Sequence, residues 1–350
     1  MTALHLEGVA CPAPFRSTTT VLLGHGSGGI LSRDLLARLI LPGLGTVAPH
    51  SLDDAAVLAI GGQRLALTTD SHVVSPLFFP GGDIGRLAVC GTVNDLAMMG
   101  AKPLALTCGL IIEEGLPFET LQRIVASMQA AAQEAGIQIA AGDTKVVQRG
   151  SADKLFINTS GIGLIADGIN ISGANAQAGD VVIISGTIGD HGIAVLSARE
   201  NLGFETTLTS DAAPLNHLVE AMLAAGEVHV LRDPTRGGLA TSLVEISEQS
   251  QVVIELEENK LPCKPAVKAA CELLGFDPLF IANEGKLVAL VKDSDAAAIL
   301  AAMQQTQYGQ EAAIIGRVIG TGKAQVRLCT TIGGTRLVDM LPGEMLPRIC

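Results

Sequence analysis

The chain has 350 residues, enough for two domains of ordinary size. Apolar residues make up 48% and charged residues 17% of it, which allows a sizeable core and excludes wholesale disorder. The net charge of −12 disfavours nucleic acid as a partner, because binding nucleic acid requires a basic surface. A phosphate ligand is still compatible with this charge if carboxylates hold Mg²⁺ beside it.

No apolar run reaches the roughly 18–20 residues of a membrane span, and residues 1–20 lack the basic and apolar regions of a secretory signal. The 7 cysteines are scattered and include no C-x-x-C pair, a pattern typical of reduced thiols. These features predict a cytoplasmic protein without a membrane partner.

The first half of the chain alternates helical and extended patterns after a loose extension at residues 1–20. A Gly-rich loop runs into an amphipathic helix over 22–41, and a strand follows at 64–70. Apolar spacing predicts a helix over 83–100, with Asp83 as N-cap and Gly100 as the stop. We further expect a buried strand over 104–112 and a helix over 117–136, with a proline at its start and a glycine at its end. Residues 137–147 should begin as a strand and continue as a loop.

The second half repeats this alternation from about residue 178. Its predicted strands are 180–186 and 286–291, and its predicted helices are 237–250 and 294–305. The pattern indicates an α+β chain of two α/β-type domains with mixed sheets. We expect the domain boundary within 166–178. The final residues contain two prolines and a glycine, so they should be extended. We therefore expect an N-terminal extension at 1–20, an N-terminal domain at 21–170, a C-terminal domain at 171–336 and a mobile tail at 337–350.

Aspartates recur where they are costly, at strand ends and in a helix among apolar residues. They are Asp53, Asp54, Asp70, Asp95, Asp143 and Asp233. Carboxylates beside apolar segments lose hydration energy unless they are paired or bind metal. Any one of them alone is better explained as a cap or turn residue. Asp95 is harder to explain in this way, because aspartate is a poor residue for mid-helix. As a set they predict a Mg²⁺–polyphosphate site.

Two further segments could bind phosphate. The loop GHGSGG, residues 24–29, would present backbone donors at a helix start, although a flexible hinge explains its glycines as well. It is not a Walker A loop, because no G-K-[ST] follows. RDPTRGG, residues 232–238, leads into a predicted helix and supplies Arg232 and Arg236, which could reach phosphate bidentately.

Together with DDAAV, TTDSHVV, GTVNDLAMMGAKP, GDTKVV, NEG and the terminal PRIC, these segments resemble the HypE family of hydrogenase maturation factors. That family belongs to the superfamily of aminoimidazole ribonucleotide synthetase, selenophosphate synthetase and thiamine-monophosphate kinase. The resemblance covers about residues 21–350, and GHGSGG, GDTKVV and PRIC carry most of its specificity. It implies two α/β domains, a homodimer formed through the N-terminal domains, and an ATP site.

The resemblance also implies a reaction. A carbamoyltransferase, HypF, would load the thiol of Cys350, and ATP-dependent dehydration would convert the S-carbamoyl group to a thiocyanate. The cyanide would then pass to iron on a HypC–HypD complex for [NiFe]-hydrogenase.

By carry-over from the family, Asp54, Asp70, Asp95 and Asp233 would hold Mg²⁺. Asp53, Asp143, Arg232 and the loop residues Gly26, Ser27, Gly28 and Gly29 would complete the ATP site. Lys145 and Glu284 match the positions that remove N–H protons. Glu284 is the better base, because carboxylates nearby raise the pKa of a lysine. A plain ion pair with Asp143 is the alternative for Lys145, and a cap is the alternative for Glu284.

Two other functions compete with this one. A selenophosphate synthetase would carry a cysteine or selenocysteine and a lysine in its Gly-rich loop, and GHGSGG has neither. A non-catalytic thiol carrier or metallochaperone would bind metal through Cys350, but a single thiol without neighbouring Cys or His is a poor metal site.

Overall fold

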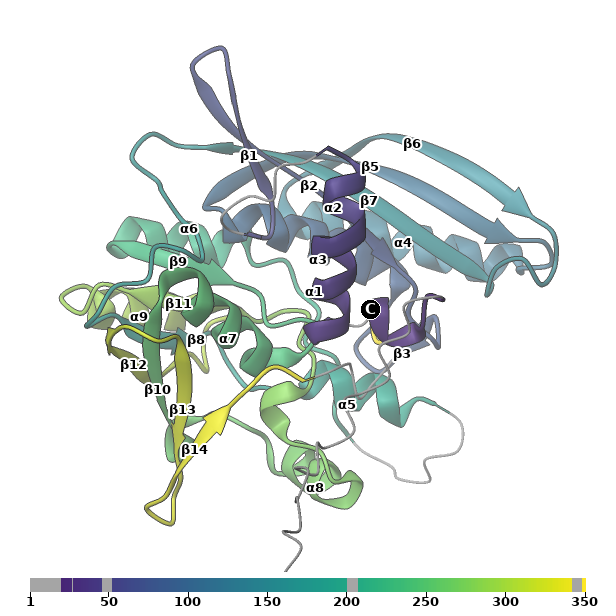
Figure 1. The fold of residues 1–350 in the computed structure, drawn as a ribbon. Helices are drawn as coiled ribbons and strands as arrows, with labels where there is room; N and C mark the ends of the chain where they lie inside the picture. Colours follow the sequence, from purple (N-terminus) through teal and green to yellow (C-terminus); the bar gives the residue numbers. More distant parts are fainter. Residues whose placement is uncertain (1–19, 27, 46–51, 200–206, 342–347) are drawn as a thin grey trace, which may run out of the picture.

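A computed structural model describes residues 20–26, 28–45, 52–199, 207–341 and 348–350 (Figure 1). Its first sheet is mixed, with strand order β1-β2-β7-β5-β6. These strands are Ala56–Ile60, Gln63–His72, Leu155–Ile165, Ala101–Glu113 and Gln138–Val147 in that order. All pairs are antiparallel except β5 with β6, which is parallel. The short strands β3 (Phe78–Phe79) and β4 (Gly82–Asp83) form a separate hairpin.

Helices α3 (Ile84–Met98) and α4 (Phe118–Ala135) cover one face of this sheet and leave the other face to solvent (Figure 1). Asp83 caps α3 as expected, accepting hydrogen bonds from the backbone N–H groups of Gly85 and Arg86 at 2.7 and 3.1 Å. Gly136 ends α4 in the left-handed conformation, as the sequence predicts. The exposed face explains why strand 104–112 is only half buried, against expectation: Leu104 and Ile111 are 48% and 43% exposed.

The second sheet has the order β14-β13-β10-β12-β8-β11-β9 and is also mixed. Its strands are Thr335–Val338, Gln325–Cys329, Val252–Glu257, Ala313–Thr321, Val181–Ile184, Val288–Val291 and Val228–Arg232 in that order. Helix α7 (Gly238–Ser250) packs on one face, and α6 (Asn216–Ala225) and α9 (Ala296–Gln304) pack on the other. Helices α5 (Asp190–Ser197) and α8 (Pro265–Leu274) join the core of the first sheet, as does the buried Ile349 near the chain end. The α+β class with two mixed sheets is therefore confirmed.

The N-terminal segment contains η1 (Leu23–Gly26), α1 (Gly29–Leu35), the π-helical turn η2 (Leu36–Ile40) and α2 (Leu41–Gly43). This agrees with the expected loop and helix. The segment packs on the C-terminal half of the chain: Arg33 forms an ion pair of 2.5 Å with Glu248 of α7, and the Ile30 N–H donates to the Leu341 carbonyl at 3.1 Å. Two short 3-10 turns, η3 (Glu258–Lys260) and η4 (Pro278–Phe280), complete the described elements.

Two expectations about local structure were wrong. Residues 137–147 do not turn into a loop, because β6 stays paired with β5 from Gln138 to Val147. Strand β14 also extends past the expected start of the tail at residue 337, since it ends at Val338, and Met340 is buried. None of the helices in the described ranges combines the length and apolar character needed to cross a bilayer.

Candidate active site

Five carboxylates from distant parts of the sequence line one cavity of about 230 Å³. They are Asp54, Asp70, Asp95, Asp233 and Glu284, and Cys350 lines the same cavity. Asp70 comes from β2, Asp95 from the last turn of α3, and Asp233 directly follows β9. The structure thus brings together the four aspartates predicted to hold metal, the predicted base and the terminal cysteine.

Close packing between α3 and β2 positions two of these side chains. A Cβ atom at Gly91 of α3 would lie 3.2 Å from the Asp70 carboxylate, so a larger residue there would crowd it. Asp95 accepts a hydrogen bond of 2.7 Å from the Thr68 hydroxyl. His72 Nε2 lies 3.3 Å from Asp70 Oδ2 without hydrogen-bond geometry, and burial lowers the pKa of His72, so the imidazole is neutral.

Burial dominates the electrostatics of the cavity. It raises the pKa of Asp95 and Asp233 well above the ordinary range, and the neighbouring aspartates raise both further. The pKa of Asp54 is also raised by burial, although Arg232 opposes the shift by donating to Asp54 at 2.7 Å. Mutually repelling buried carboxylates of this kind are stabilised when a cation or protons bind among them.

Glu284 is held by its neighbours in NEG and by α3. Asn283 donates to the Pro234 carbonyl and accepts from the Gly189 N–H, at 2.9 and 2.7 Å. Gly285 permits close approach, because a Cβ there would lie 1.8 Å from the Asp211 carbonyl oxygen. Asn94 of α3 donates to the Glu284 carbonyl at 3.3 Å, which assigns a structural role to the asparagine of the ND motif.

Glu284 is the side chain in the cavity whose surroundings best suit proton exchange. It is 4% exposed, and among the described atoms its Oε1 has no hydrogen-bond partner. Burial raises its pKa well above the ordinary value, and Asp233, Asp70 and Asp211 add to that shift. A buried carboxyl group with a raised pKa can exchange protons near neutral pH.

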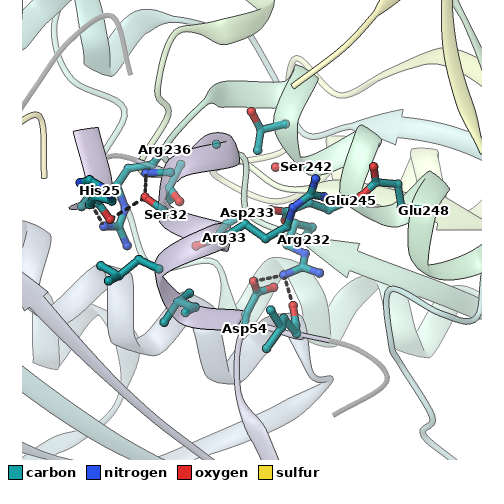
Figure 2. Close-up of a pocket in the computed structure, with 18 of the residues that line it drawn as sticks. His25, Ser32, Arg33, Asp54, Arg232, Asp233, Arg236, Ser242, Glu245 and Glu248 are labelled. Carbon is teal, nitrogen blue, oxygen red and sulfur yellow. Dashed lines mark hydrogen bonds and ion pairs between the residues drawn. The ribbon is translucent and has the colours of Figure 1, made fainter. Parts of the chain in front are cut away.

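A second cavity of about 600 Å³ adjoins the first and shares Asp54, Asp233, Thr235 and Arg236 with it. Figure 2 shows Asp54, Asp233 and Arg236 among the residues that line this second cavity. The Gly-rich loop lies on its wall through His25, Gly26, Gly28 and Gly29. Arg236 donates to the Gly26 carbonyl at 3.0 Å, and a Cβ at Gly28 would lie 3.2 Å from the Arg236 Cβ. Ser27 lies outside the described residues.

Several polar atoms of residues that line the second cavity are buried. Among the described atoms, Thr241 Oγ1 and Gln249 Oε1 are buried without hydrogen-bond partners, as are Nε and Nη2 of Arg232. Helix α7 begins at Gly238, beside the lining residues Thr235 and Arg236, and the N-terminus of a helix favours anions. Arg232 is committed to Asp54 and to the Leu52 carbonyl, so it orients the first cavity's carboxylates more than it faces a phosphate.

Three predicted site residues lie elsewhere. Asp53 faces residues 172–173 and accepts hydrogen bonds of 2.8 Å from the Ser172 hydroxyl and the Gly173 N–H. Asp143 and Lys145 stand on the exposed face of β6 and line neither cavity. They form an ion pair of 2.6 Å with each other, which is the alternative that the sequence left open.

Both halves of the chain match family models, and close relatives span nearly its full length. Residues 52–165 match the N-terminal domain of AIR synthase related proteins, and residues 177–329 match the C-terminal domain. The carbamoyl dehydratase HypE of Cupriavidus necator is 53% identical over 330 residues, which is 94% of each chain. The chain belongs to the HypE family.

Solved HypE structures agree with this assignment. A HypE–HypF complex contains a chain that is 52% identical with a TM-score of 0.83, covering 88% of this chain and 99% of that one. A second structure, HypE in complex with ATP, is 50% identical with a TM-score of 0.80. It covers 95% of this chain and 100% of that one. The resemblance seen in the sequence motifs is thus confirmed at the level of whole chains.

Sequence motifs missed several residues that build the site. Asp211 accepts a hydrogen bond from the Glu284 N–H beside the first cavity, and Thr241 and Gln249 line the second. Asp211 lies in TSDAAPLN, which carries no motif or periodicity. Arg236 was identified as a phosphate-binding candidate, but its contact with the Gly-rich loop depends on folding across 210 residues of sequence.

Proposed function

We propose that this chain is an ATP-dependent carbamoyl dehydratase that acts on an S-carbamoyl group carried by its own Cys350. The placement of Cys350 on the wall of the carboxylate cavity carries this proposal. The product would be a thiocyanate on Cys350, which supplies the cyanide ligand of the [NiFe]-hydrogenase iron. The name of the Cupriavidus necator relative, carbamoyl dehydratase HypE, supports the same activity.

The 600 Å³ cavity is the proposed ATP site. Its Gly-rich loop, the start of α7 and its buried polar atoms without hydrogen-bond partners among the described atoms suit a nucleoside triphosphate. A HypE relative has been solved with ATP. The shared wall at Asp54, Asp233, Thr235 and Arg236 is where the terminal phosphate would meet the group on Cys350. Phosphoryl transfer needs this kind of juxtaposition, because it depends on positioning and charge neutralisation.

The reaction must remove one oxygen and two protons from the carboxamide. Phosphoryl transfer to the carboxamide oxygen converts it into a leaving group. The C–O bond then breaks while both N–H protons are removed, giving S–C≡N, ADP and inorganic phosphate. Glu284 is the proposed proton acceptor, because its buried Oε1 has no hydrogen-bond partner among the described atoms and its pKa is raised.

The carboxylate set fits Mg²⁺ held together with phosphates. Within the described parts of the chain, no three His, Cys, Asp or Glu side chains are arranged to hold a metal ion by themselves. Mg²⁺ in nucleotide sites usually takes only one or two carboxylates, with phosphate and water oxygens as its other ligands. Asp54, Asp70, Asp95 and Asp233 are the proposed ligands, and the ion would neutralise the charge on the transferred phosphoryl group.

A homodimer through the N-terminal sheet is proposed from its uncovered outer face. Leu67 and Ile162 are paired across β2 and β7 and are 44% and 37% exposed, and Ile111 on β5 adds to the same face. An apolar sheet face of this kind usually marks an interface. Double substitution Leu67→Asp and Ile162→Asp should yield a monomer by light scattering; a persistent dimer would contradict the proposed interface.

Lys145 lies on this same outer face, so a catalytic role for it requires the dimer. Within one chain its ammonium group is 2.6 Å from Asp143 and lines neither cavity. We therefore propose that Lys145, with Asp143 beside it, acts in the cavity of the partner subunit. A two-fold dimer would give each cavity one such lysine.

Mass spectrometry of the C-terminal peptide tests the whole proposal. The purified chain is incubated with HypF and carbamoyl phosphate, with and without ATP for the second step. Cys350 should gain a carbamoyl group, and the adduct should become lighter by one water only when this chain can use ATP. An unmodified Cys350, or an adduct that never loses water, would exclude the dehydratase. Transfer to a HypC–HypD complex is then read as return of the unmodified peptide.

A further inference from the structure

The chain end is held by its backbone. The backbone oxygens of the last residues each accept a hydrogen bond: Arg348 from Arg199 Nη2 at 2.9 Å, Ile349 from His191 Nε2 at 2.8 Å, and Cys350 from the Val73 N–H at 3.1 Å. None of these contacts involves the thiol. They hold the backbone of the last residues beside the cavity that Cys350 lines.

Side chains of the tail add to this hold. Ile349 is 1% exposed and belongs to the core beneath the first sheet. Arg348 donates to the Val73 carbonyl at 2.9 Å and to Asp153 at 2.6 Å. Its φ of 56° is unusual for a residue other than glycine, and such a conformation persists only where surrounding contacts enforce it.

His191 connects the tail to a neighbouring loop. Burial lowers the pKa of His191, so the ring is neutral, and its Nε2 must carry the hydrogen because a carbonyl can only accept. Nδ1 therefore accepts from the Ser210 hydroxyl, 2.8 Å away. Ser210 is itself fixed, since its N–H donates to the Pro80 carbonyl at 2.7 Å and its oxygen accepts from the Ala212 N–H at 3.1 Å.

The same loop holds Glu284. Asp211 accepts from the Glu284 N–H at 3.0 Å, and its carbonyl occupies the space beside Gly285. The Ala213 carbonyl accepts from Asn94, which also donates to the Glu284 carbonyl. Loop residues 210–213 thus contact His191, which binds the tail, and also contact Glu284 and Asn94.

We propose that His191, Arg199 and the loop 210–213 form a tail anchor that docks Cys350 in the cavity and couples this docking to the position of Glu284. The coupling deepens the proposed dehydratase function and rests on it, whereas the docking does not. His191, Arg199 and Asp211 act here as positioning residues, since none of them contacts the reacting group. In this proposal HypF loads Cys350 on the undocked tail, so the two steps of the cycle should respond oppositely to the strength of the anchor.

Alkylation of Cys350 measures docking without any partner. The reduced full-length chain is treated with iodoacetamide, and the C-terminal peptide is quantified by mass spectrometry. Arg199→Gln should raise the alkylation rate about tenfold, the effect of losing one hydrogen bond from a charged donor. Arg199→Lys should restore part of the protection. Arg317→Gln, which breaks an exposed ion pair with Asp293, is the matched control and should change nothing.

The split between the two catalytic steps tests the coupling. Arg199→Gln should raise the rate of carbamoylation by HypF and lower the rate of water loss from the adduct. Asp211→Ala, which removes a contact to Glu284 and none of the tail contacts above, should raise alkylation of Cys350 by a smaller factor, because coupling is reciprocal. A general loss of structure would lower both steps together and lower Tm.

Each outcome is decisive. Unchanged alkylation in folded Arg199→Gln would overturn the anchor, and faster alkylation with normal dehydration would overturn the coupling. If Arg199→Gln fails to fold, Asp153→Asn, which removes only the outer ion pair of Arg348, should still raise alkylation about two- to threefold. If HypF does not load even the parent chain, the proposed function fails while the alkylation result still judges the docking.

Discussion

The cavity at Cys350 and the outer face of the N-terminal sheet carry the same kinds of side chain in opposite surroundings. At the cavity, burial raises the pKa of Asp95 and Glu284. On the sheet face, Asp143 and Lys145 are 71% and 68% exposed, and the hydrogen bond from Lys145 lowers the pKa of Asp143. Both places were found from short acidic motifs. The comparison teaches that the surroundings, more than the residue type, decide which carboxylate can exchange protons or bind a cation in one chain.

The largest effect should come from Glu284→Gln. The glutamine keeps the size of the side chain but cannot accept a proton, so dehydration of carbamoylated Cys350 should fall by about 10²–10⁴-fold. Carbamoylation by HypF should persist, because Glu284 does not take part in it. The measurement is the loss of water from the C-terminal peptide over time. Glu220→Gln, at a side chain that is 77% exposed, is the control; normal dehydration in Glu284→Gln would remove Glu284 as the base.

Asp95→Asn tests the buried side of the comparison through stability. The folded-state pKa of Asp95 is raised, so between its unfolded and folded pKa values the folded chain binds more protons than the unfolded chain. The contribution of Asp95 to stability is therefore present at low pH and lost as pH rises through the folded pKa. In the presence of a chelator, Asp95→Asn should raise Tm relative to the parent at neutral pH, and the gain should shrink toward about pH 5.

Mg²⁺ and ATP supply the second half of that test. They should raise Tm of the parent, because a ligand that binds only the folded chain stabilises it, and should raise Tm of Asp95→Asn less. A variant that is less stable than the parent at every pH would show that Asp95 holds the fold together instead of straining it.

Much of the fold could be predicted because its signals are local. Asp83 and Gly136 end their helices through caps that need no distant partner, and α3 and α4 lie where the apolar spacing placed them. Strand β6 was predicted too short because GDT is typical of a loop, while parallel pairing with β5 keeps it extended. Tertiary contacts overrode the local preference there.

The candidate site likewise contains residues that could be predicted from the sequence and residues that could not. Asp54, Asp70, Asp95, Asp233 and Glu284 could be named from motifs, and the structure brings them to one cavity. The tail anchor could not be named, because its donors bind backbone carbonyls, which every sequence has. His191 lies 158 residues from Ile349 in the sequence, and no sequence motif links the two positions. The exposure of Lys145 also depends on which sheet face the helices cover.

Mixing two inactive variants tests whether the two regions meet across a dimer. If Lys145 acts in the partner's cavity, a heterodimer of Lys145→Ala with Glu284→Gln contains one intact site, formed by the wild-type Glu284 of one subunit and the wild-type Lys145 of the other. Random exchange at equal amounts should restore about a quarter of parental dehydration. Each variant alone should stay inactive. No recovery after proven subunit exchange would place Lys145 outside the partner's cavity.

The smallest effect should come from Asp143→Asn, measured for stability in the monomeric Leu67→Asp and Ile162→Asp background. The folded-state pKa of Asp143 is lowered, so any stabilisation by its ion pair is fully present at neutral pH and lost as pH falls through the folded pKa. Water screens this exposed pair, and the ordering of two side chains offsets its attraction. Tm at neutral pH should therefore equal that of the monomeric parent, with and without added salt. A clear fall in Tm would mean that the pair is covered within one chain, and the outer face would then resemble the cavity.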